Sequence, residues 1–205
     1  MKEIKKKFIY LISPNNIKKN FYYNLDKIFN EKIVEFFQLR LKYYDNQKII
    51  KIGRKVKKIC KKHNVKFIIN DDPFMSRIIK SDGCHLGQSD MNILEARKIL
   101  KNKIIGITCN NSKNLIKKAS KEKVDYIAIG AFHKTKTKKV KYIAKLRLIS
   151  EAKKLFKKPI VVIGGINAKN YKKLLLHKAN FLAISGYIWK NKKLKPYEAI
   201  KEFKL

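Results

Sequence analysis

Short apolar segments recur along the whole chain, and each is followed by a polar turn and then by a stretch with helical periodicity. The apolar segments are rich in β-branched and aromatic residues, a composition typical of strands. The helical spacing is clear in Ile49, Ile52, Val56 and Ile59. Strands that alternate with helices predict a parallel sheet whose strands are joined by crossover helices.

The pattern contains eight expected strands. They are residues 7 to 12, 33 to 39, 66 to 70, 82 to 86, 103 to 108, 124 to 130, 159 to 163 and 180 to 185. Eight units favour closure into an α/β fold of the TIM-barrel type, a single (β/α)8 barrel. An open doubly wound sheet is the alternative, and it requires a reversal of strand order. No linker or shift in composition divides the 205 residues, so we expect one domain over residues 1 to 205.

The formal net charge is +36, from 51 Lys and Arg residues against 15 Asp and Glu residues. Such an excess attracts polyanions, so a basic nucleic-acid-binding protein is one alternative function. The charges are spread along the chain, almost all are lysines, and no basic run is interleaved with aromatic residues. Solvated helix faces are the better interpretation. We therefore expect phosphorylated small molecules, and not nucleic acid, as partners.

Three cysteines, Cys60, Cys84 and Cys109, are odd in number and lack CxxC spacing, which fits a reducing compartment. The apolar run from Phe8 to Ile12 is too short for a membrane span or a signal peptide. The sequence thus predicts a cytoplasmic protein that does not associate with membranes. It leaves the oligomeric state open.

Active sites of (β/α)8 barrels lie at the C-terminal ends of the strands. After the second expected strand comes Gln38-Leu39-Arg40-Leu41-Lys42, and alternation places Gln38, Arg40 and Lys42 on one face. Arginine offers a planar fork for two phosphate oxygens, and lysine adds a movable point charge. This segment therefore suits a diphosphate, although Lys42 alone could equally be a surface residue.

Acidic residues follow the third and fourth strands, at Asp71, Asp72 and Asp90. Between Phe67 and Arg97 there are five acidic and three basic residues, a balance of −2 in a chain of +36. Carboxylates at adjacent strand ends can hold Mg²⁺ together with substrate phosphates. Alternatively, one of the paired aspartates caps the next helix, which would have a proline in its first turn.

Further polar residues end the fourth, fifth and sixth strands. We interpret His85 as a hydrogen-bonded packing residue and not as a base, because a lone histidine at a strand end usually has that role. Thr108 ends the fifth strand, and residues 135 to 138 alternate threonine with lysine after the sixth. Hydroxyl groups that alternate with lysines predict an anion-binding loop.

Glycines follow the last two strands, at Gly164-Gly165 and at Ser185-Gly186. They allow backbone N–H groups to approach a phosphate, at the place where many such barrels bind one. A tight turn with no ligand is the alternative for the glycine pair. Two anion sites are therefore expected across one barrel mouth, one cationic and assisted by a metal, the other built from backbone.

Six motifs in this order resemble those of the thiamine phosphate synthase family along nearly the whole chain. They are residues 38–42, 69–71, 82–90, 135–138, 163–166 and 184–186. The resemblance implies transfer of a hydroxymethylpyrimidine group from its diphosphate to the nitrogen of a thiazole phosphate, which gives thiamine phosphate and pyrophosphate. It also implies that the diphosphate leaves before the attack, so that no protein nucleophile or general base is needed.

The resemblance implies a role for each matching residue. The pyrimidine diphosphate would be held by Gln38, Leu39, Arg40, Leu41, Lys42, Asn70, Thr108 and Lys138, of which Arg40, Lys42 and Lys138 would be catalytic. The cofactor Mg²⁺ would be bound by Asp71 and Asp90. The thiazole phosphate would be held by Thr135, Lys136, Thr137, Gly165, Ile184 and Ser185.

Three features differ from the family pattern. Thr108 stands where a serine is usual and keeps the hydroxyl, and His133-Lys134 stands where phenylalanine and proline are usual. Asp72 stands where the family often has a basic residue, which bears on which of Asp71 and Asp72 contacts the metal. A related alternative is a thiazole tautomerase of the same superfamily, which shares the thiazole phosphate site but lacks the residues for a diphosphate and a metal. The residues for a diphosphate and a metal that favour the synthase are Arg40, Lys42, Asn70, Asp71, Asp90 and Lys138.

Overall fold

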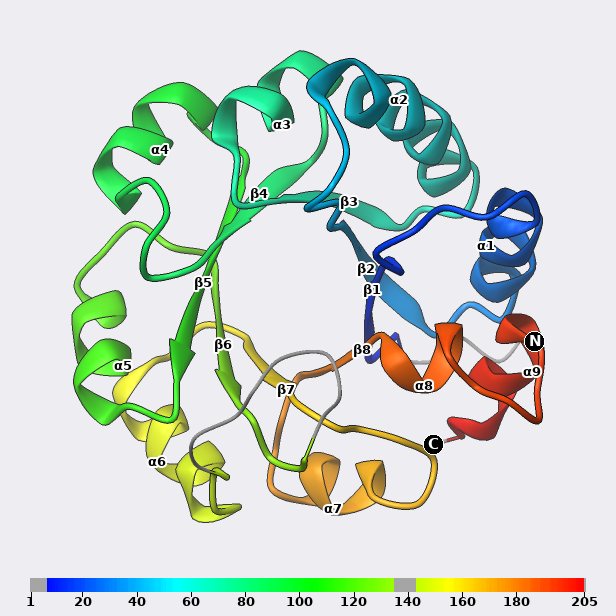
Figure 1. The fold of residues 1–205 in the computed structure, drawn as a ribbon. Coiled ribbons are helices and arrows are strands. Elements are labelled where there is room, and N and C mark those ends of the chain that lie inside the picture. The colour runs from blue at the N-terminus through cyan, green and yellow to red at the C-terminus, as the bar shows by residue number, and fades with distance from the viewer. Residues whose placement is uncertain (1–6, 135–142, 205) are drawn as a thin grey trace, which may run out of the picture.

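The computed structural model of the chain describes residues 7–134 and 143–204. Eight parallel strands close into a barrel in sequential order, with β8 paired to β1 (Figure 1). The strands are β1 (Ile9–Ile12), β2 (Val34–Leu39), β3 (Lys66–Asn70), β4 (Gly83–Leu86), β5 (Ile104–Asn110), β6 (Tyr126–Gly130), β7 (Ile160–Ile163) and β8 (Phe181–Ile184). The predicted barrel is confirmed, and the open doubly wound sheet is excluded.

Helices surround the barrel as an outer ring (Figure 1). They are α1 (Phe21–Asn30), α2 (Asn46–Lys62), α3 (Pro73–Ile79), α4 (Ile93–Leu100), α5 (Lys113–Ser120), α6 (Arg147–Leu155), α7 (Tyr171–Leu176), α8 (Gly186–Trp189) and α9 (Pro196–Ala199), followed by the 3₁₀ turn η1 (Ile200–Glu202). Side-chain oxygens at the N-caps begin several of them: Asp45 accepts from the backbone N–H of Lys48, and Asn92 from that of Glu95.

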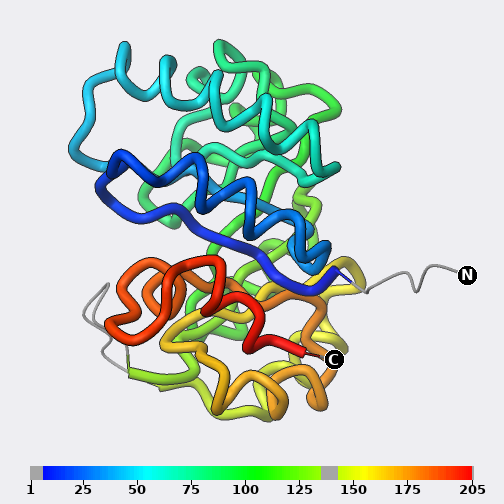
Figure 2. Tube along the Cα trace, turned by 90° about the vertical axis from the view of Figure 1, so that its right-hand side faces the viewer, coloured from blue at the N-terminus to red at the C-terminus, as the bar shows by residue number. Residues whose placement is uncertain are grey.

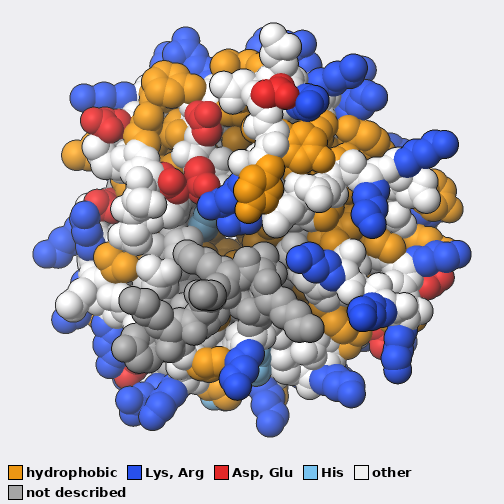
Figure 3. All heavy atoms as spheres, in the orientation of Figure 1, with side chains coloured by type: hydrophobic (Ala, Val, Ile, Leu, Met, Phe, Trp, Pro, Cys, Tyr) orange, Lys and Arg blue, Asp and Glu red, His pale blue; other side chains and the backbone are white. Residues whose placement is uncertain are grey.

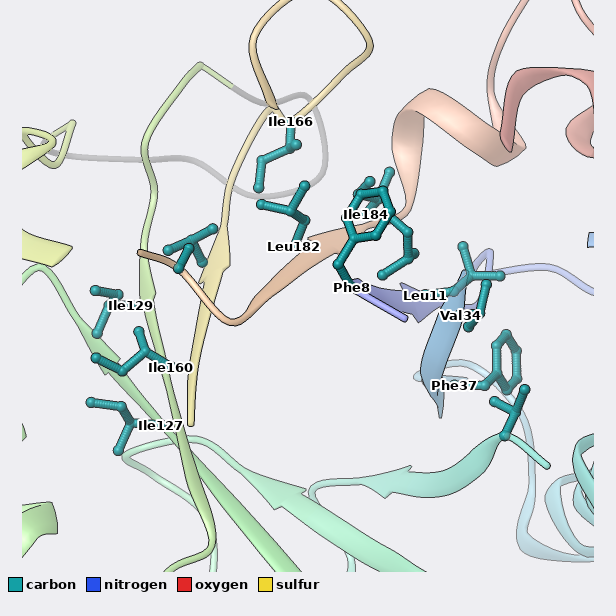
Figure 4. Packing of buried hydrophobic residues seen from close by; sticks show 14 of the residues in the cluster. Phe8, Leu11, Val34, Phe37, Ile127, Ile129, Ile160, Ile166, Leu182 and Ile184 are labelled. Carbon is teal, nitrogen blue, oxygen red and sulfur yellow. The ribbon is translucent and has the colours of Figure 1, made fainter. Parts of the chain in front are cut away.

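The buried side chains form two layers. The outer layer lies between the strands and the helices, where residues such as Leu11, Phe37 and Ile184 pack together (Figure 4). The inner layer fills the barrel and includes Tyr10 and Tyr126. Since successive strand residues point to opposite faces, each strand supplies both layers, and the barrel is solid rather than a pore.

All eight strands run in the same direction, so their C-terminal ends open at one end of the barrel, here called the mouth. Seen from the side, the C-terminus lies at the end opposite to the segment that follows β2, drawn in light blue (Figure 2). In the part of the chain that the structure describes, no helix is both long and apolar enough to cross a membrane.

Candidate active site

The segment after β2 follows the predicted alternation. Phe36 packs in the inner layer and Phe37 in the outer layer, so Gln38 points to the barrel interior and is 2% exposed. Leu39 and Leu41 pack in the outer layer. Their side chains thus support the strand from outside, and only their backbone groups are available to a ligand in the mouth.

Ser13, directly after β1, ties this segment to the residue that follows β8, the other strand that pairs with β1. Its hydroxyl accepts from the backbone N–H of Arg40 at 2.9 Å, and its backbone N–H donates to the carbonyl of Gln38 at 2.9 Å. Its own carbonyl accepts from the hydroxyl of Ser185 at 3.2 Å. This buried serine was not among the predicted site residues, yet it joins the segments after β2 and β8, which are expected to bind different substrates.

Asp71 and Asp90 follow β3 and β4 and lie near enough for the carboxyl group of Asp90 to act on that of Asp71. Burial and the neighbouring Asp90 carboxyl raise the pKa of Asp71 to about 6, whereas Lys42 and Arg40 act to lower it. Two carboxylates side by side repel each other, which favours either a proton or a cation between them. The predicted acidic pair and the predicted cationic pair therefore lie together.

Asp72 has a different role from its neighbour. It is the N-cap of α3, where its side chain accepts from the backbone N–H of Met75 at 2.9 Å, and Pro73 is in the first turn. Asp71 takes a left-handed backbone conformation, with φ of 65°, and its N–H donates to the carbonyl of His85. The structure thus distinguishes the two aspartates: Asp72 begins the helix, and Asp71 is turned toward Asp90.

The carboxylate of Asp90 is held by its own loop. Its Oδ2 accepts from the backbone N–H of Gly87 at 2.6 Å. Within the described residues, no three His, Cys, Asp or Glu side chains gather into a metal site. A pair of carboxylates completed by water and phosphate oxygens is the arrangement that Mg²⁺ commonly uses, so the donor set fits this ion.

His85 lies inside the barrel in a row of hydrogen-bonded side chains. Its Nδ1 is 2.9 Å from the hydroxyl of Tyr126, its Nε2 is 2.8 Å from the hydroxyl of Thr108, and the hydroxyls of Tyr126 and Tyr10 are 2.7 Å apart. Burial lowers the pKa of His85 to about 4. Its interpretation as a hydrogen-bonded packing residue agrees with this geometry.

The glycine pair after β7 has a steric requirement of its own. Gly164 and Gly165 have φ of +105° and +60°. A Cβ added at Gly165 would lie 2.3 Å from the carbonyl oxygen of Lys134, and one added at Gly164 would lie 2.2 Å from the Cβ of Ala131. The tight turn, which was the alternative to a phosphate site, therefore accounts for both glycines. Their presence is no independent sign of a bound phosphate.

Ile184 ends β8 with its side chain in the outer layer, 1% exposed, so only its backbone faces the mouth. Ser185 follows and is tied to Ser13 as described. Asn70 is half-buried at the end of β3. The predicted loop residues Thr135, Lys136, Thr137 and Lys138 lie outside the described residues.

The face of the molecule that carries the mouth is shown in Figure 3. Acidic side chains lie beside basic ones near its centre, whereas the remaining Lys and Arg side chains are spread around the rim. The side chains that bear charge on the described part of this face are therefore of both signs near its centre.

The comparisons with known proteins agree on one family. The family described as thiamine monophosphate synthase matches residues 9–188. The thiamine-phosphate synthase of Pelagibacter ubique (strain HTCC1062) is 60% identical over 203 residues, covering 98% of this chain and 98% of that protein. The chain belongs to the thiamine monophosphate synthase family. A second thiamine-phosphate synthase, from Erythrobacter litoralis, is 35% identical over 186 residues, covering 88% of this chain and 87% of its own.

Solved structures support the fold. Thiamine phosphate pyrophosphorylase from Pyrococcus furiosus superposes with a TM-score of 0.84 at 23% identity, covering 95% of this chain and 92% of that one. A 3-hexulose-6-phosphate synthase superposes with a TM-score of 0.64 at 14% identity, covering 95% of this chain and 97% of that one. At these identities the likeness concerns the barrel architecture alone.

Proposed function

We propose that this chain is a thiamine-phosphate synthase. It transfers a pyrimidinylmethyl group from hydroxymethylpyrimidine diphosphate to the ring nitrogen of a thiazole phosphate. The observation that carries the proposal is the 60% identity to a thiamine-phosphate synthase over 98% of both chains. The grouping of Arg40 and Lys42 around Asp71 and Asp90 supports the diphosphate half of the reaction.

In the first step the bond between the methylene carbon and the diphosphate oxygen breaks, and the electron pair leaves with the diphosphate. Arg40 and Lys42 stand beside the acidic pair and would bind the departing oxygens, Arg40 through two parallel hydrogen bonds. Asn70, at the end of β3, and Thr108, two residues before the end of β5, would add hydrogen bonds to the same substrate. Lys138 would contribute a further charge.

Asp71 and Asp90 are proposed to hold one Mg²⁺. When bound, the ion would neutralise charge on the diphosphate and so make it a better leaving group. Without a cation, burial together with the neighbouring Asp90 carboxylate keeps the pKa of Asp71 high. Lys42 and Arg40 lower this pKa but do not cancel the rise, and this leaves the pair suited to a divalent ion.

In the second step the lone pair of the thiazole nitrogen forms the new bond to the methylene carbon. Gly165, Ile184 and Ser185 at the β7 and β8 ends would hold the thiazole phosphate, together with Thr135, Lys136 and Thr137. The hydrogen bonds of Ser13 to Arg40 and toward Ser185 join the two substrate positions through one residue. Holding two reactants in a fixed relation supplies much of the acceleration expected in a reaction of this kind.

We further propose that the enzyme works in the cytoplasm on phosphorylated small molecules and without nucleic acid. The cysteines Cys60, Cys84 and Cys109 are all buried free thiols, as a reducing compartment allows. Burial raises the pKa of Cys109 to about 12, so that this thiol stays protonated and unreactive.

The test is to incubate the protein with both substrates and Mg²⁺ and to measure thiamine phosphate and pyrophosphate. Formation of both products in equal amounts is the expected result. Conversion of a thiazole phosphate isomer without use of the pyrimidine diphosphate would instead identify a thiazole tautomerase. Tight DNA binding at physiological salt with no turnover would favour the nucleic-acid alternative.

A further inference from the structure

The hydrogen-bonded row inside the barrel ends at a residue of the mouth. It runs from Tyr10 on β1 through Tyr126 on β6 and His85 on β4 to Thr108 on β5. Both tyrosines are 2% exposed and His85 is 9% exposed, whereas Thr108 is half-buried. The row therefore joins the closed interior of the barrel to the side chain that is expected to meet the pyrimidine diphosphate.

A neutral imidazole has one N–H donor and one acceptor nitrogen, so the hydrogen bonds of the row can run in either of two directions, here called its two polarities. In the first, the Nε2–H of His85 donates to Thr108, Tyr126 donates to Nδ1, and Tyr10 donates to Tyr126. Every hydrogen in the row then has an acceptor. The hydroxyl hydrogen of Thr108 itself is left for a group in the mouth.

In the second polarity each of these bonds is reversed. Thr108 donates to Nε2, the Nδ1–H donates to Tyr126, and Tyr126 donates to Tyr10. Tyr126 is the one hydrogen-bond partner of the Tyr10 hydroxyl among the described residues, so the buried Tyr10 hydrogen would have no acceptor there. A buried donor without an acceptor is costly, and this favours the first polarity.

We propose that Tyr10, Tyr126 and His85 position Thr108 as a hydrogen-bond donor directed at the diphosphate of the pyrimidine substrate. This inference rests on the proposed function. Phosphate oxygens accept hydrogen bonds, so a threonine whose hydrogen is already used by the protein would present only lone pairs to them. The backbone of Thr108 is also held, because its carbonyl accepts from the side chain of Gln88 at 2.5 Å. His85 and the tyrosines are thus positioning residues.

The tautomer of His85 is a direct test, because it can be read in the free protein. We expect ¹⁵N NMR of histidine-labelled protein to show His85 protonated on Nε2, with the signal assigned by its loss in His85→Gln. Protonation on Nδ1 would overturn the inference whatever the activity of the enzyme. If wild type proves inactive, the proposed function fails, and the tautomer still decides the polarity of the row.

The second test is binding. Tyr126→Phe removes the donor to Nδ1, so the hydrogen bond offered by Thr108 should weaken, and the Kd for the pyrimidine diphosphate should rise about tenfold. The Kd for the thiazole phosphate should not change. Thr108→Ser keeps the hydroxyl and should bind within about threefold of wild type.

A double-mutant cycle shows whether Tyr126 acts through Thr108. In a Thr108→Ala background, Tyr126→Phe should raise the Kd less than about twofold, because the group that it positions is already absent. Tyr171→Phe is the matched control, since it also removes the hydroxyl of a buried tyrosine, one that bonds the backbone of Lys204. Equal rises in Kd from Tyr126→Phe in both backgrounds would overturn the positioning role.

Discussion

The two sides of the barrel mouth are built in opposite ways. The side formed by β2, β3 and β4 places charged side chains together, with Asp71 and Asp90 as neighbours and Arg40 near them. The side formed by β7 and β8 relies on backbone, with Gly164 and Gly165 in conformations that leave no room for a side chain. On the first side, the two neighbouring carboxylates repel each other unless a cation or a proton lies between them. On the second side, the backbone conformation and the close packing of the glycines decide the structure. A charge change should therefore alter ligand binding on the first side, and a volume change should alter folding on the second.

The largest expected effect is on catalysis and comes from the acidic side. Asp71→Asn or Asp90→Asn keeps the shape of the side chain but removes a charge, so each should lower turnover by about 100-fold or more at fixed Mg²⁺. Thiazole phosphate binding should persist. The measurement is turnover against Mg²⁺ concentration, with excess chelator as the metal-free condition.

Asp72→Asn is the matched control for this experiment. Asparagine caps helices as well as aspartate does, so the start of α3 should survive and the Mg²⁺ dependence should stay that of wild type. Full activity of the wild-type enzyme in chelator would contradict the metal assignment. So would an unchanged Mg²⁺ dependence in both active-site variants.

The next largest effect is on stability and comes from the glycine side. Gly165→Ala places a Cβ 2.3 Å from the carbonyl oxygen of Lys134 at a φ of +60°, and we expect a cost of about 2 kcal/mol. For a chain of this size that lowers the melting temperature by about 4 to 8 °C. Gly53→Ala in α2 is the control, because alanine favours the helix and its Cβ would meet side-chain atoms of the buried Ile79 rather than backbone, so we expect a smaller cost than at Gly165. A Gly165→Ala variant that melts like wild type would show that the turn tolerates a side chain.

A smaller effect is expected on substrate binding, at Arg40, which lies on the same side of the mouth as Asp71 and Asp90. Arg40→Lys keeps the positive charge but loses the planar fork, so the Kd for the pyrimidine diphosphate should rise about tenfold while the melting temperature is unchanged. The exposed Arg54→Lys on α2 is the control and should behave as wild type. Wild-type affinity in Arg40→Lys would remove Arg40 from the diphosphate site.

The fold could be predicted from sequence because its signal is repeated and local. Each of the eight strands is an apolar run bounded by turn residues, so an error in one would not have changed the architecture. The burial of Leu39 and Leu41 likewise follows from alternation along a single strand. Features that depend on the residue pattern within a single strand or helix could therefore be predicted from the sequence.

Features that depend on several strands could not be predicted in this way. The division of labour between Asp71 and Asp72 depends on a left-handed backbone at Asp71, which the sequence Asn-Asp-Asp does not reveal. Ser13 and Tyr126 acquire their roles from partners that lie far away in the chain, such as Arg40 and His85. The sequence did offer one sign for Tyr126: it is a tyrosine in an otherwise apolar strand, and a buried tyrosine hydroxyl usually has a hydrogen-bond partner.

The smallest expected effect is a stabilisation, and it again sets the acidic side apart. In the folded protein the pKa of Asp71 is raised from 3.8 to about 6, so between these pH values the folded state binds more protons than the unfolded state. Stability is therefore lost as the pH rises through this window. Asp71→Asn does not have this loss, and without metal at pH 7.5 it should be more stable than wild type by about 1 kcal/mol, a figure reduced for the partial exposure of the group.

Low pH and added Mg²⁺ should each remove the stability advantage of Asp71→Asn over wild type. Well below pH 3.8 the wild-type carboxyl is protonated in both states, so the difference in melting temperature between the two proteins should be smallest there. Added Mg²⁺ should stabilise wild type by binding between Asp71 and Asp90 and should leave the variant unaffected. The measurement is thermal unfolding in chelator and in Mg²⁺ across this pH range. If Asp71→Asn were instead less stable than wild type in chelator at pH 7.5, the charges of Arg40 and Lys42 would already stabilise the Asp71 carboxylate. The two sides of the mouth would then differ in shape alone.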